Sequence, residues 1–411
     1  MNLLFVSETD FTRKIVFDVH LLPEAMSLRG HKVFMLYYES MWGKPDNNKK
    51  LWVDRGLSKE IIANRALDNS HIHLIKPKFI RLSMLSRASA FITHLLEINR
   101  VIHEEKIDAI VLYSVPTNGL QAVRYARKAE IPVLFRSLDV LNKLVSNSLL
   151  RYPTKVMESK VYSRVDRFLA LTPNLCDYAV SLGTKKENTR VLPMTVDTNT
   201  FYPMMKSKVL MNRWGLTDND KVILFMGTLF NFSGLDEFIS STWERFKNNP
   251  DIKLLIVGDG QQRILLESLI TKYNLNNQIS ITGFQPYDEM PLYINLADVC
   301  INPFKENDIT RDIFPGKTVQ FLACGKPLVM RPLRGVKSMI YGSEQGVIYD
   351  GNDLESTVFS LLNNPETLDD VGQYGLRYVK EIFSYEKVAQ QLEEEIVEII
   401  SEHKRKTLAT T

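Results

Sequence analysis

The chain has 411 residues, of which 45% are apolar and 24% are charged, and its formal net charge is +3. One hydrophobic core rarely supports so long a chain, so we expect two domains of roughly 150 to 200 residues each. No stretch approaches the roughly 18 to 20 uncharged apolar residues that a membrane span requires. The three cysteines suggest neither disulfides nor zinc, and the first residues lack the features of a secretory leader. These features predict a cytoplasmic protein.

Charge is unevenly divided along the chain. Residues 1–190 carry 29 lysines and arginines against 19 aspartates and glutamates, whereas residues 191–411 carry 22 against 29. A basic half suggests an anionic partner. No recognition helix, zinc finger or aromatic RNA-binding pattern accompanies this charge, so we expect no nucleic-acid partner. An anionic lipid surface, a phosphate-bearing acceptor and a merely solvated surface all stay open.

The first half alternates short apolar runs with helical segments, which is the rhythm of a parallel βαβ sheet. We expect helices at residues 17–29, 119–129 and 154–163. The expected strands are residues 3–6, 31–36, 71–75, 109–112, 132–135 and 167–171. Around residues 191–203 the periodicity stops and turn-forming residues accumulate, which marks a domain boundary.

The second half repeats the pattern, with expected strands at residues 221–226, 252–257, 278–282, 299–301 and 327–330. Residues 384–402 are rich in Glu, Gln and aliphatic side chains and predict a last helix. The sequence therefore predicts an α/β protein of two Rossmann-like, doubly wound parallel sheets facing a central cleft. The domains would be residues 1–190, joined by 384–411, and residues 191–383. Ligands of such sheets bind beyond the carboxyl ends of the strands.

A glycine turn follows the first strand of the second domain. Gly227 and Thr228 end that strand and Ser233 and Gly234 open the next helix, an arrangement that can aim backbone N–H groups at a phosphate. Such junctions also occur simply as turns, so that interpretation stays open. The next strand ends in Gly258-Asp259-Gly260 without the third glycine of a dinucleotide fingerprint, so NAD binding is not predicted.

The segment from Phe314 to Gln320 is more informative. Pro315 and Gly316 break the chain before an expected helix that runs through Ala323, and Lys317 and Thr318 add a cation and a hydroxyl at its start. Such a helix start suits a diphosphate. An ordinary capped helix with a solvated lysine is the alternative.

In order and spacing, these segments resemble the donor-binding domain of glycosyltransferase family four, whose members have the GT-B fold. The resemblance is carried by Val196-Asp197 with Phe201 and Pro203, by residues 222–229, 255–260 and 281–284, and by Ala323-Cys-Gly-Lys-Pro-Leu-Val329. Residues 1–190 are similar more weakly, at Arg29-Gly-His-Lys-Val33. The resemblance implies a divergent, retaining, metal-independent enzyme of the hexosyltransferase type that uses a nucleotide-diphosphate sugar. It also implies that the last helix crosses back to the N-terminal domain.

The same resemblance implies a donor site. Its donor-binding residues would be Gly227, Thr228, Ser233, Gly234, Gly258, Asp259, Gly260, Gly283, Phe284, Pro315, Gly316, Lys317, Thr318 and Gln320, and Asp312 and Lys317 would be catalytic. Thr228 and Ser233 replace an arginine and a lysine that usually neutralise the diphosphate. Asp312 and Gln320 stand at the positions of the paired glutamates. Lys317 could supply the missing charge, with Lys305 and Arg311 as nearby alternatives.

In the N-terminal domain the resemblance predicts a His-Asp pair after the strand at 132–135, but Leu138 occupies the histidine position. Arg136 and Asp139 are the catalytic candidates there, with a plain surface ion pair as the alternative. The loop after the first strand offers further candidates for contact with an acceptor or the donor phosphates, namely Thr9, Asp10, Arg13 and Lys14.

The reaction implied is sugar transfer to a glycan or lipid-linked acceptor in cell-envelope polysaccharide assembly, with no cofactor and no metal. In a retaining enzyme of this kind the leaving diphosphate assists attack, and the protein stabilises charge on the departing phosphates. One alternative is a catalytically weakened protein that binds a glycan or a partner, to which Thr228, Ser233, Gln320 and Leu138 point. Another is a nucleotide-sugar 2-epimerase on the same fold, which would need acid and base side chains in the cleft.

Residues 76–100 contain five basic residues and one acid, Glu97, among bulky apolar side chains. This pattern suits peripheral contact with an anionic membrane at its inner face, or a helix covering the acceptor side of the domain.

Asp218-Asn219-Asp220 matches a manganese-binding pattern but lies in a polar turn, where a solvated role is expected. His71 and His73 have no spaced acidic or cysteine partner, so we expect no metal site there.

Overall fold

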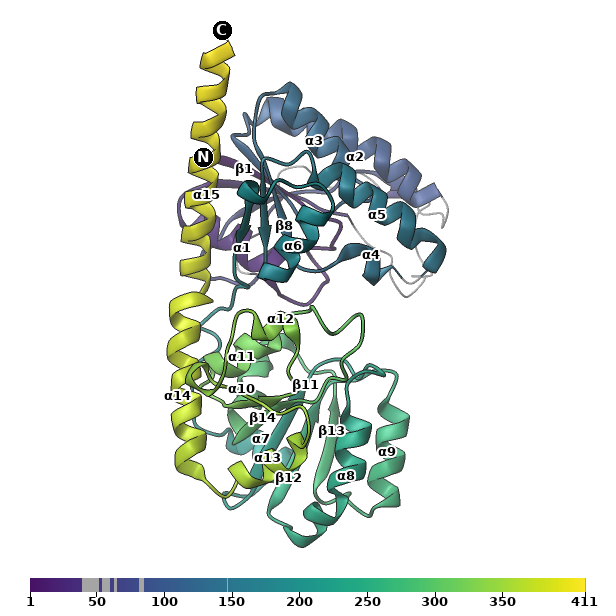
Figure 1. Ribbon diagram of the computed structural model, residues 1–411, viewed down its shortest axis with the longest axis vertical. Coiled ribbons are helices and arrows are strands. Elements are labelled where there is room, and N and C mark those ends of the chain that lie inside the picture. The colour runs from purple at the N-terminus through teal and green to yellow at the C-terminus, as the bar shows by residue number, and fades with distance from the viewer. Residues whose placement is uncertain (39–51, 54–59, 63–64, 81–84, 146, 411) are drawn as a thin grey trace. The chain divides into compact units, whose positions relative to one another are not determined.

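The computed structural model describes residues 1–38, 52–53, 60–62, 65–80, 85–145 and 147–410 (Figure 1). The chain forms two compact units. Unit 1 comprises Met1–Thr195 and Tyr385–Thr411, and unit 2 comprises Val196–Ser384. The chain thus leaves unit 1 slightly beyond residue 190, where the turn-forming stretch begins. No described helix is long and apolar enough to cross a bilayer.

Unit 1 is built on a sheet with the strand order β10-β9-β8-β7-β1-β2-β5-β4. All neighbouring strands are parallel except β4 and β5. The strands are β1 (Asn2–Val6), β2 (Lys32–Leu36), β4 (Glu60–Ile62), β5 (Ile72–Ile75), β7 (Ala109–Leu112), β8 (Val133–Ser137), β9 (Arg167–Ala170) and β10 (Thr189–Val191); β3 (Trp52–Val53) and β6 (Phe79–Ile80) form a separate antiparallel pair. All six strands predicted for this half are confirmed. They were readable because strands covered on both faces are continuously apolar.

The helices of unit 1 are α1 (Asp18–Leu28), α2 (Leu85–Glu104), α3 (Gly119–Lys128), α4 (Leu141–Leu144), α5 (Ser148–Tyr162) and α6 (Pro173–Ser181). Helices α2, α3 and α5 lie side by side (Figure 1). Helix α5 starts at Ser148, earlier than predicted, because the Asn147 side chain accepts the N–H of Leu149 and caps the helix. Its buried face, Thr154, Glu158, Val161 and Tyr162, has the spacing of an amphipathic helix.

The last helix, α15 (Tyr385–Thr410), belongs to unit 1 and packs against α1. Glu393 pairs with Arg29 and, at 2.8 Å, with His31. The buried Arg167 contacts three glutamates of α15, at Glu395, Glu398 and Glu402, with nitrogen–oxygen distances of 3.3 to 3.5 Å. The predicted return of the last helix to the N-terminal domain is therefore confirmed.

Unit 2 contains a parallel sheet with the order β13-β12-β11-β14-β15-β16. Its strands are β11 (Lys221–Met226), β12 (Ile252–Val257), β13 (Ile279–Gly283), β14 (Val299–Asn302), β15 (Leu328–Met330) and β16 (Val347–Tyr349). The chain runs outward from β11 through β12 to β13 and then returns to the other side of β11 as β14. The boundary between β11 and β14 is the switch point of this sheet, the place where ligands of doubly wound sheets bind.

The helices of unit 2 are α7 (Lys208–Arg213), α8 (Leu235–Asn248), α9 (Arg263–Lys272), α10 (Met290–Leu296), α11 (Lys317–Ala323), α12 (Arg334–Lys337), α13 (Leu354–Leu361) and α14 (Pro365–Ile382). Helix α14 was not predicted from the sequence because two glycines interrupt its pattern. Those glycines allow close packing: a Cβ at Gly372 would lie 2.2 Å from the carbonyl oxygen of Gly325, and one at Gly375 would lie 2.9 Å from the Cα of Gly346.

Candidate functional site

Two glycine turns interlock at the carboxyl ends of β11 and β12. A Cβ at Gly258 would lie 2.0 Å from the carbonyl oxygen of Gly227, and a Cβ at Gly260 would lie 2.7 Å from that of Leu229. Gly227 and Gly258 also have φ angles of +139° and +149°, which other residues rarely adopt. Only glycine fits these positions, and the result is a smooth backbone surface next to the switch point.

Lys317, the first residue of α11, lies at this switch point. Its buried Nζ is 3.9 Å from the ring centroid of Phe225, at the end of β11, and 4.2 Å from that of Phe304, which follows β14. A Cβ at Gly227 would lie 3.6 Å from this Nζ, and only atoms of Lys317 would be within 4 Å of it. The structure thus brings the predicted residues Gly227 and Lys317 close together.

The Lys317 ammonium has no hydrogen-bond partner among the described residues. Burial lowers the pKa of Lys317 well below its ordinary value of 10.5. The two aromatic faces attract a cation and offset part of this cost, but no carboxylate does. A negatively charged ligand beside Gly227 would supply such a partner.

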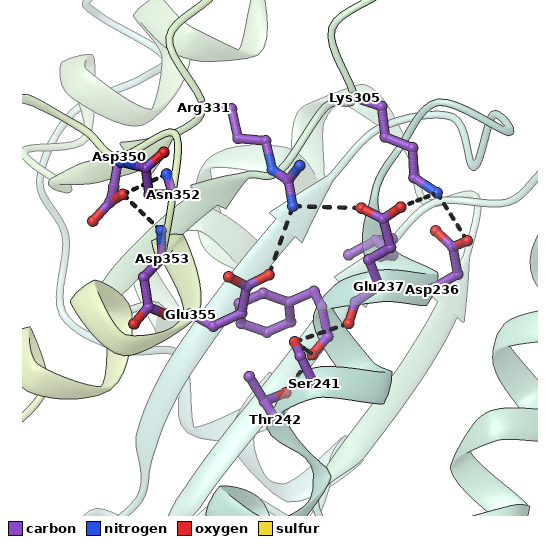
Figure 2. Close-up of polar contacts among 12 residues, drawn as sticks. Asp236, Glu237, Ser241, Thr242, Lys305, Arg331, Asp350, Asn352, Asp353 and Glu355 are labelled. Carbon is purple, nitrogen blue, oxygen red and sulfur yellow. Dashed lines mark hydrogen bonds and ion pairs between the residues drawn. The ribbon is translucent and has the colours of Figure 1, made fainter.

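Lys305 and Arg311, the two alternatives to Lys317, already have acidic partners, and so does the neighbouring Arg331. Figure 2 shows Lys305 and Arg331 on either side of Glu237: Lys305 Nζ is 3.0 Å from Asp236 and 2.9 Å from Glu237, and Arg331 is 3.4 Å from Glu237. The exposed Arg311 pairs with Glu306 at 2.9 Å. Of the three candidates, Lys317 alone lacks an acidic partner in the described part of the chain.

Three predicted donor contacts also make contacts within the protein. The Ser233 hydroxyl is buried and donates to Gln262 Oε1 at 2.6 Å, so it does not face a ligand. Gly234 allows α8 to begin against the chain after β14, because a Cβ there would lie 1.9 Å from the carbonyl oxygen of Pro303. The N–H of Thr318 donates to the Pro315 carbonyl at 2.9 Å, whereas its buried hydroxyl has no hydrogen-bond partner among the described residues. The contact predicted for Ser233 is corrected, because its hydroxyl is bonded to Gln262. The contacts predicted for Gly234 and Thr318 stay predictions.

The remaining donor-side residues lie around the same sheet edge. Asp259 accepts from Arg263 at 2.8 Å and from the N–H of Gly260 at 2.7 Å, and these bonds lower its pKa. Arg263 also lies 3.3 Å from the position of a Cβ at Gly283. Phe284 presents an exposed ring directly after β13. The other members, Thr228, Pro315, Gly316 and Gln320, are partly exposed, and Gln320 is hydrogen-bonded to the Tyr287 hydroxyl.

Asp312 is placed by a tight turn and is largely neutralised. Its Oδ1 accepts from Arg334 Nε at 2.6 Å and from the second guanidinium nitrogen at 2.5 Å. The backbone beneath it packs on Gly335, where a Cβ would lie 2.4 Å from the Asp312 carbonyl oxygen. A sugar hydroxyl at Asp312 would therefore have to share the carboxylate with Arg334.

In unit 1, Arg136 is buried completely, so the prediction of a catalytic Arg136 is wrong. Its guanidinium bonds both oxygens of the equally buried Asp18, at 3.1 and 2.7 Å, and donates to the carbonyl oxygens of Leu192 and Pro193. No surface of the guanidinium is left for a substrate. The pair anchors the segment that leads out of unit 1.

Asp139 and the loop after β1 differ from Arg136 in exposure. Asp139 follows β8 and is partly exposed as a whole residue. Its carboxyl lies deeper, and this burial raises the pKa of the carboxyl to about 7. Asp10 is buried and its Oδ1 accepts the N–H groups of Thr12 and Arg13, at 3.1 and 3.2 Å, so it shapes the loop. Arg13 and Lys14 are exposed beside it, and the N–H of Thr9 bonds the Ser7 hydroxyl at 3.0 Å.

Two family models match the chain. The model described as "Glycosyl transferases group 1" matches residues 207–378, and the "Glycosyl transferase 4-like domain" matches residues 20–195. Together they account for most of both units. Each half of the chain thus matches a glycosyltransferase domain model, and the chain is a glycosyltransferase. It has the GT-B fold, as the sequence resemblance implied.

The curated relatives of this glycosyltransferase are distant. It is 27% identical over 160 residues to alpha-D-kanosaminyltransferase of Streptomyces kanamyceticus, covering 38% of this chain and 40% of that protein. It is 21% identical over 304 residues to alpha-monoglucosyldiacylglycerol synthase of Acholeplasma laidlawii, covering 69% and 75%. A GDP-mannose-dependent alpha-(1-6)-phosphatidylinositol monomannoside mannosyltransferase of Mycolicibacterium smegmatis is 28% identical over 45% of this chain and 50% of its own length.

Solved structures show the same fold. Sucrose-phosphate synthase of Thermosynechococcus elongatus superposes with a TM-score of 0.71 at 18% identity, covering 100% of both chains. Anabaena HepE in complex with UDP and glucose gives a TM-score of 0.68 at 14% identity, covering 96% of this glycosyltransferase and 99% of that chain. At such identities the comparison concerns the fold alone.

The sequence did not reveal several residues on which the site depends. Phe225 and Phe304 read as ordinary apolar residues, and nothing in the spacing of Asp18 and Arg136, 118 positions apart, indicates a pair. Asp218 pairs with Lys208, and Asp220 bonds the N–H of Thr217 at 2.6 Å, so both serve the turn before β11. No group of three or more metal-ligating side chains gathers within the described residues of this glycosyltransferase.

Replacement of Arg136 by Leu should destabilise the protein by about 3–5 kcal/mol, because it leaves the buried Asp18 carboxylate without its partner. Urea unfolding measures the change, and Arg124→Leu, on the exposed face of α3, is the matched control. A catalytic Arg136 would instead show normal stability with lost turnover, and that result would contradict the structural assignment.

Replacement of Lys317 by Met should raise the free energy of unfolding at neutral pH by about 1–3 kcal/mol, because it removes an unpaired buried amine. Since burial lowers the pKa of Lys317, the unfolded chain binds this proton more readily, and wild-type stability falls as the pH drops below 10.5 through the lowered pKa. The gain should therefore shrink toward pH 10. A destabilised Lys317→Met protein, judged against exposed Lys272→Met, would contradict the burial argument.

Proposed function

We propose that this protein is a retaining glycosyltransferase that moves a sugar from a nucleotide-diphosphate donor to a glycan or lipid-linked acceptor in cell-envelope polysaccharide assembly. The observation that carries the donor assignment is the buried Lys317 ammonium, which has no acidic partner in the described structure and lies at the switch point of unit 2. The donor diphosphate would be that partner.

In the proposed reaction the bond between the sugar and the diphosphate breaks and negative charge develops on the leaving phosphate. Lys317 stabilises this charge in a site of low polarity, where a fixed cation acts more strongly than in water. Gly227 lies next to Nζ and has no side chain that would separate a phosphate from it. No protein nucleophile is required, because the leaving diphosphate assists attack by the acceptor. The proposal requires no cofactor and no metal ion.

The lipid-linked form of the acceptor is supported by two relatives that are named after lipids, one after a diacylglycerol and the other after a phosphatidylinositol. Helix α2 adds support for peripheral membrane contact through residues 76–100, because Leu85, Ile92 and Leu96 present large apolar side chains to solvent. Its Arg100 is paired with Glu97 and Glu104, so less charge is available than the count suggests. Residues 81–84 of this stretch, including Arg81, lie outside the described residues.

A catalytically weakened binding protein is the second candidate. It is favoured by one observation, the neutralisation of Asp312 by Arg334, which blunts the carboxylate expected to orient the sugar. Slow donor hydrolysis separates the two candidates, because a protein that only binds would retain nucleotide affinity without turnover.

Calorimetric titration with UDP, GDP and ADP, followed by donor hydrolysis with the matching nucleotide sugars, tests the proposal. We expect one nucleotide diphosphate to bind saturably and Lys317→Met to weaken it by roughly 10- to 100-fold, the range of a charge-assisted contact in a buried site. Lys272→Met, on the exposed face of α9, should bind like the wild type. Absence of nucleotide binding in the wild type would refute the proposal.

Donor binding should be linked to proton uptake. Because burial lowers the pKa of Lys317 in the free protein and an adjacent diphosphate raises it again, nucleotide affinity should fall as pH rises between the two pKa values. Titration in buffers of different ionisation enthalpy measures the protons taken up. In Lys317→Met this component should vanish. Equal proton uptake in the two proteins would assign the linkage to another group.

A further inference from the structure

Four large apolar side chains project from α4 and the first turn of α5. Leu144 is 54% exposed, Leu149 81%, Leu150 54% and Tyr152 76%. They fall within nine consecutive positions of the chain. Scattered exposed apolar residues are ordinary on a protein surface, but a concentration of this size marks a surface that meets an apolar partner.

This part of α5 is not required by the core. The buried face of the helix begins only at Thr154 and continues through Glu158 and Val161. Pro153 has no N–H to donate to the carbonyl of Leu149, so the first turn depends on its cap, where Asn147 accepts the N–H of Leu149 at 3.0 Å. The turn Ser148–Tyr152 is thus a capped apolar extension in front of the packed part of the helix.

The topology places this extension at the ligand-binding edge of unit 1. Helix α5 leads into the parallel strand β9, just as α3 leads into β8 and α2 into β7. Helices of such units run opposite to their strands, so their first turns lie at the edge where the strands end. Leu85, which is also exposed, begins α2 at the same edge. In Figure 1 the three helices lie next to one another.

The charge of this segment selects the kind of partner. Residues 141–157 contain Lys143, Arg151 and Lys155 and no aspartate or glutamate. The first acid that follows, Glu158, is buried and bonded to Asn142 at 2.7 Å and to the Tyr178 hydroxyl at 2.9 Å. Apolar side chains flanked by basic ones, with an aromatic residue among them, suit the interface of an anionic lipid bilayer, which offers acyl chains and negative headgroups together.

We infer that Leu144, Leu149, Leu150 and Tyr152 form an interfacial anchor that inserts into an anionic lipid surface and sets the acceptor edge of unit 1 against it. The anchor is separate from residues 76–100. Its consequence for substrate rests on the proposed transferase function: an acceptor reached at this edge is carried on a lipid in the same bilayer, rather than taken from bulk solution.

The test uses the full chain and flotation with vesicles of phosphatidylcholine alone or mixed equally with phosphatidylglycerol. The anchor variant is Leu149→Glu with Tyr152→Glu. The matched control is Val209→Glu with Ile264→Glu, two side chains of unit 2 that are 70% and 81% exposed. A third variant, Ile92→Glu with Leu96→Glu, changes α2 alone. Nucleotide titration of each protein reports separately on the donor site.

We expect the wild type and the control to bind the anionic vesicles and not the neutral ones. The anchor variant should bind at least tenfold more weakly, since it loses apolar area and gains two negative charges near a negative surface. It should keep wild-type nucleotide affinity. A wild type that ignores anionic vesicles, an anchor variant that binds them as well as the wild type, or equal weakening in the control would each overturn the anchor. Loss of nucleotide binding in the wild type would instead remove the proposed function and leave the vesicle result standing.

Discussion

A buried lysine that has no acidic partner among the described residues lies at the switch point of unit 2. Lys317 lies between the rings of Phe225 and Phe304, and these residues stand at the ends of β11 and β14, the two strands that meet at the switch point. Placing a charge there is costly, and the protein lowers that cost with ring faces instead of a carboxylate. A carboxylate would have secured the fold more firmly, but it would have occupied the position that an anionic ligand needs.

The neighbouring cations differ from Lys317 because each of them has an acidic partner. Lys305 and Arg331 are tied to Asp236, Glu237 and Glu355 along the same edge of the sheet. In unit 1 the buried Arg136 is matched completely by Asp18 and by backbone carbonyls of the segment leaving the unit. These matched cations hold chain segments in place, whereas Lys317, which has no acidic partner in the described part of the chain, is the cation that we propose to bind the donor. The contrast explains why one lysine is more informative about function than the larger number of basic residues.

The sequence was most informative where local pattern and burial agree. The predicted strands of both sheets correspond to described strands because parallel strands covered on both faces must be apolar throughout. Gly227 and Lys317 could be proposed as site residues because glycine at a strand end and a lysine after Pro-Gly each carry a local signal, and their role stays a prediction. Arg136 was assigned the wrong role because its partner Asp18 lies far away in the chain, and Ser233 because only the fold brings Gln262 to its hydroxyl. Short β16 and glycine-interrupted α14 lacked the periodicity on which prediction depends.

Charge and apolar exposure also differ between the two halves of the chain in a way that suits the proposed function. Residues 1–190 are basic, and most of the exposed large apolar side chains described in this half lie on α2, α4 and α5. The second half is acidic, with its key cation removed from solvent. Exposed basic residues act over a distance on an extended anionic surface and are weakened by salt, whereas a buried ammonium acts only on a group in contact and is little screened. Salt should therefore separate the two kinds of binding, since it weakens attachment to a charged surface far more than recognition of a diphosphate at Lys317.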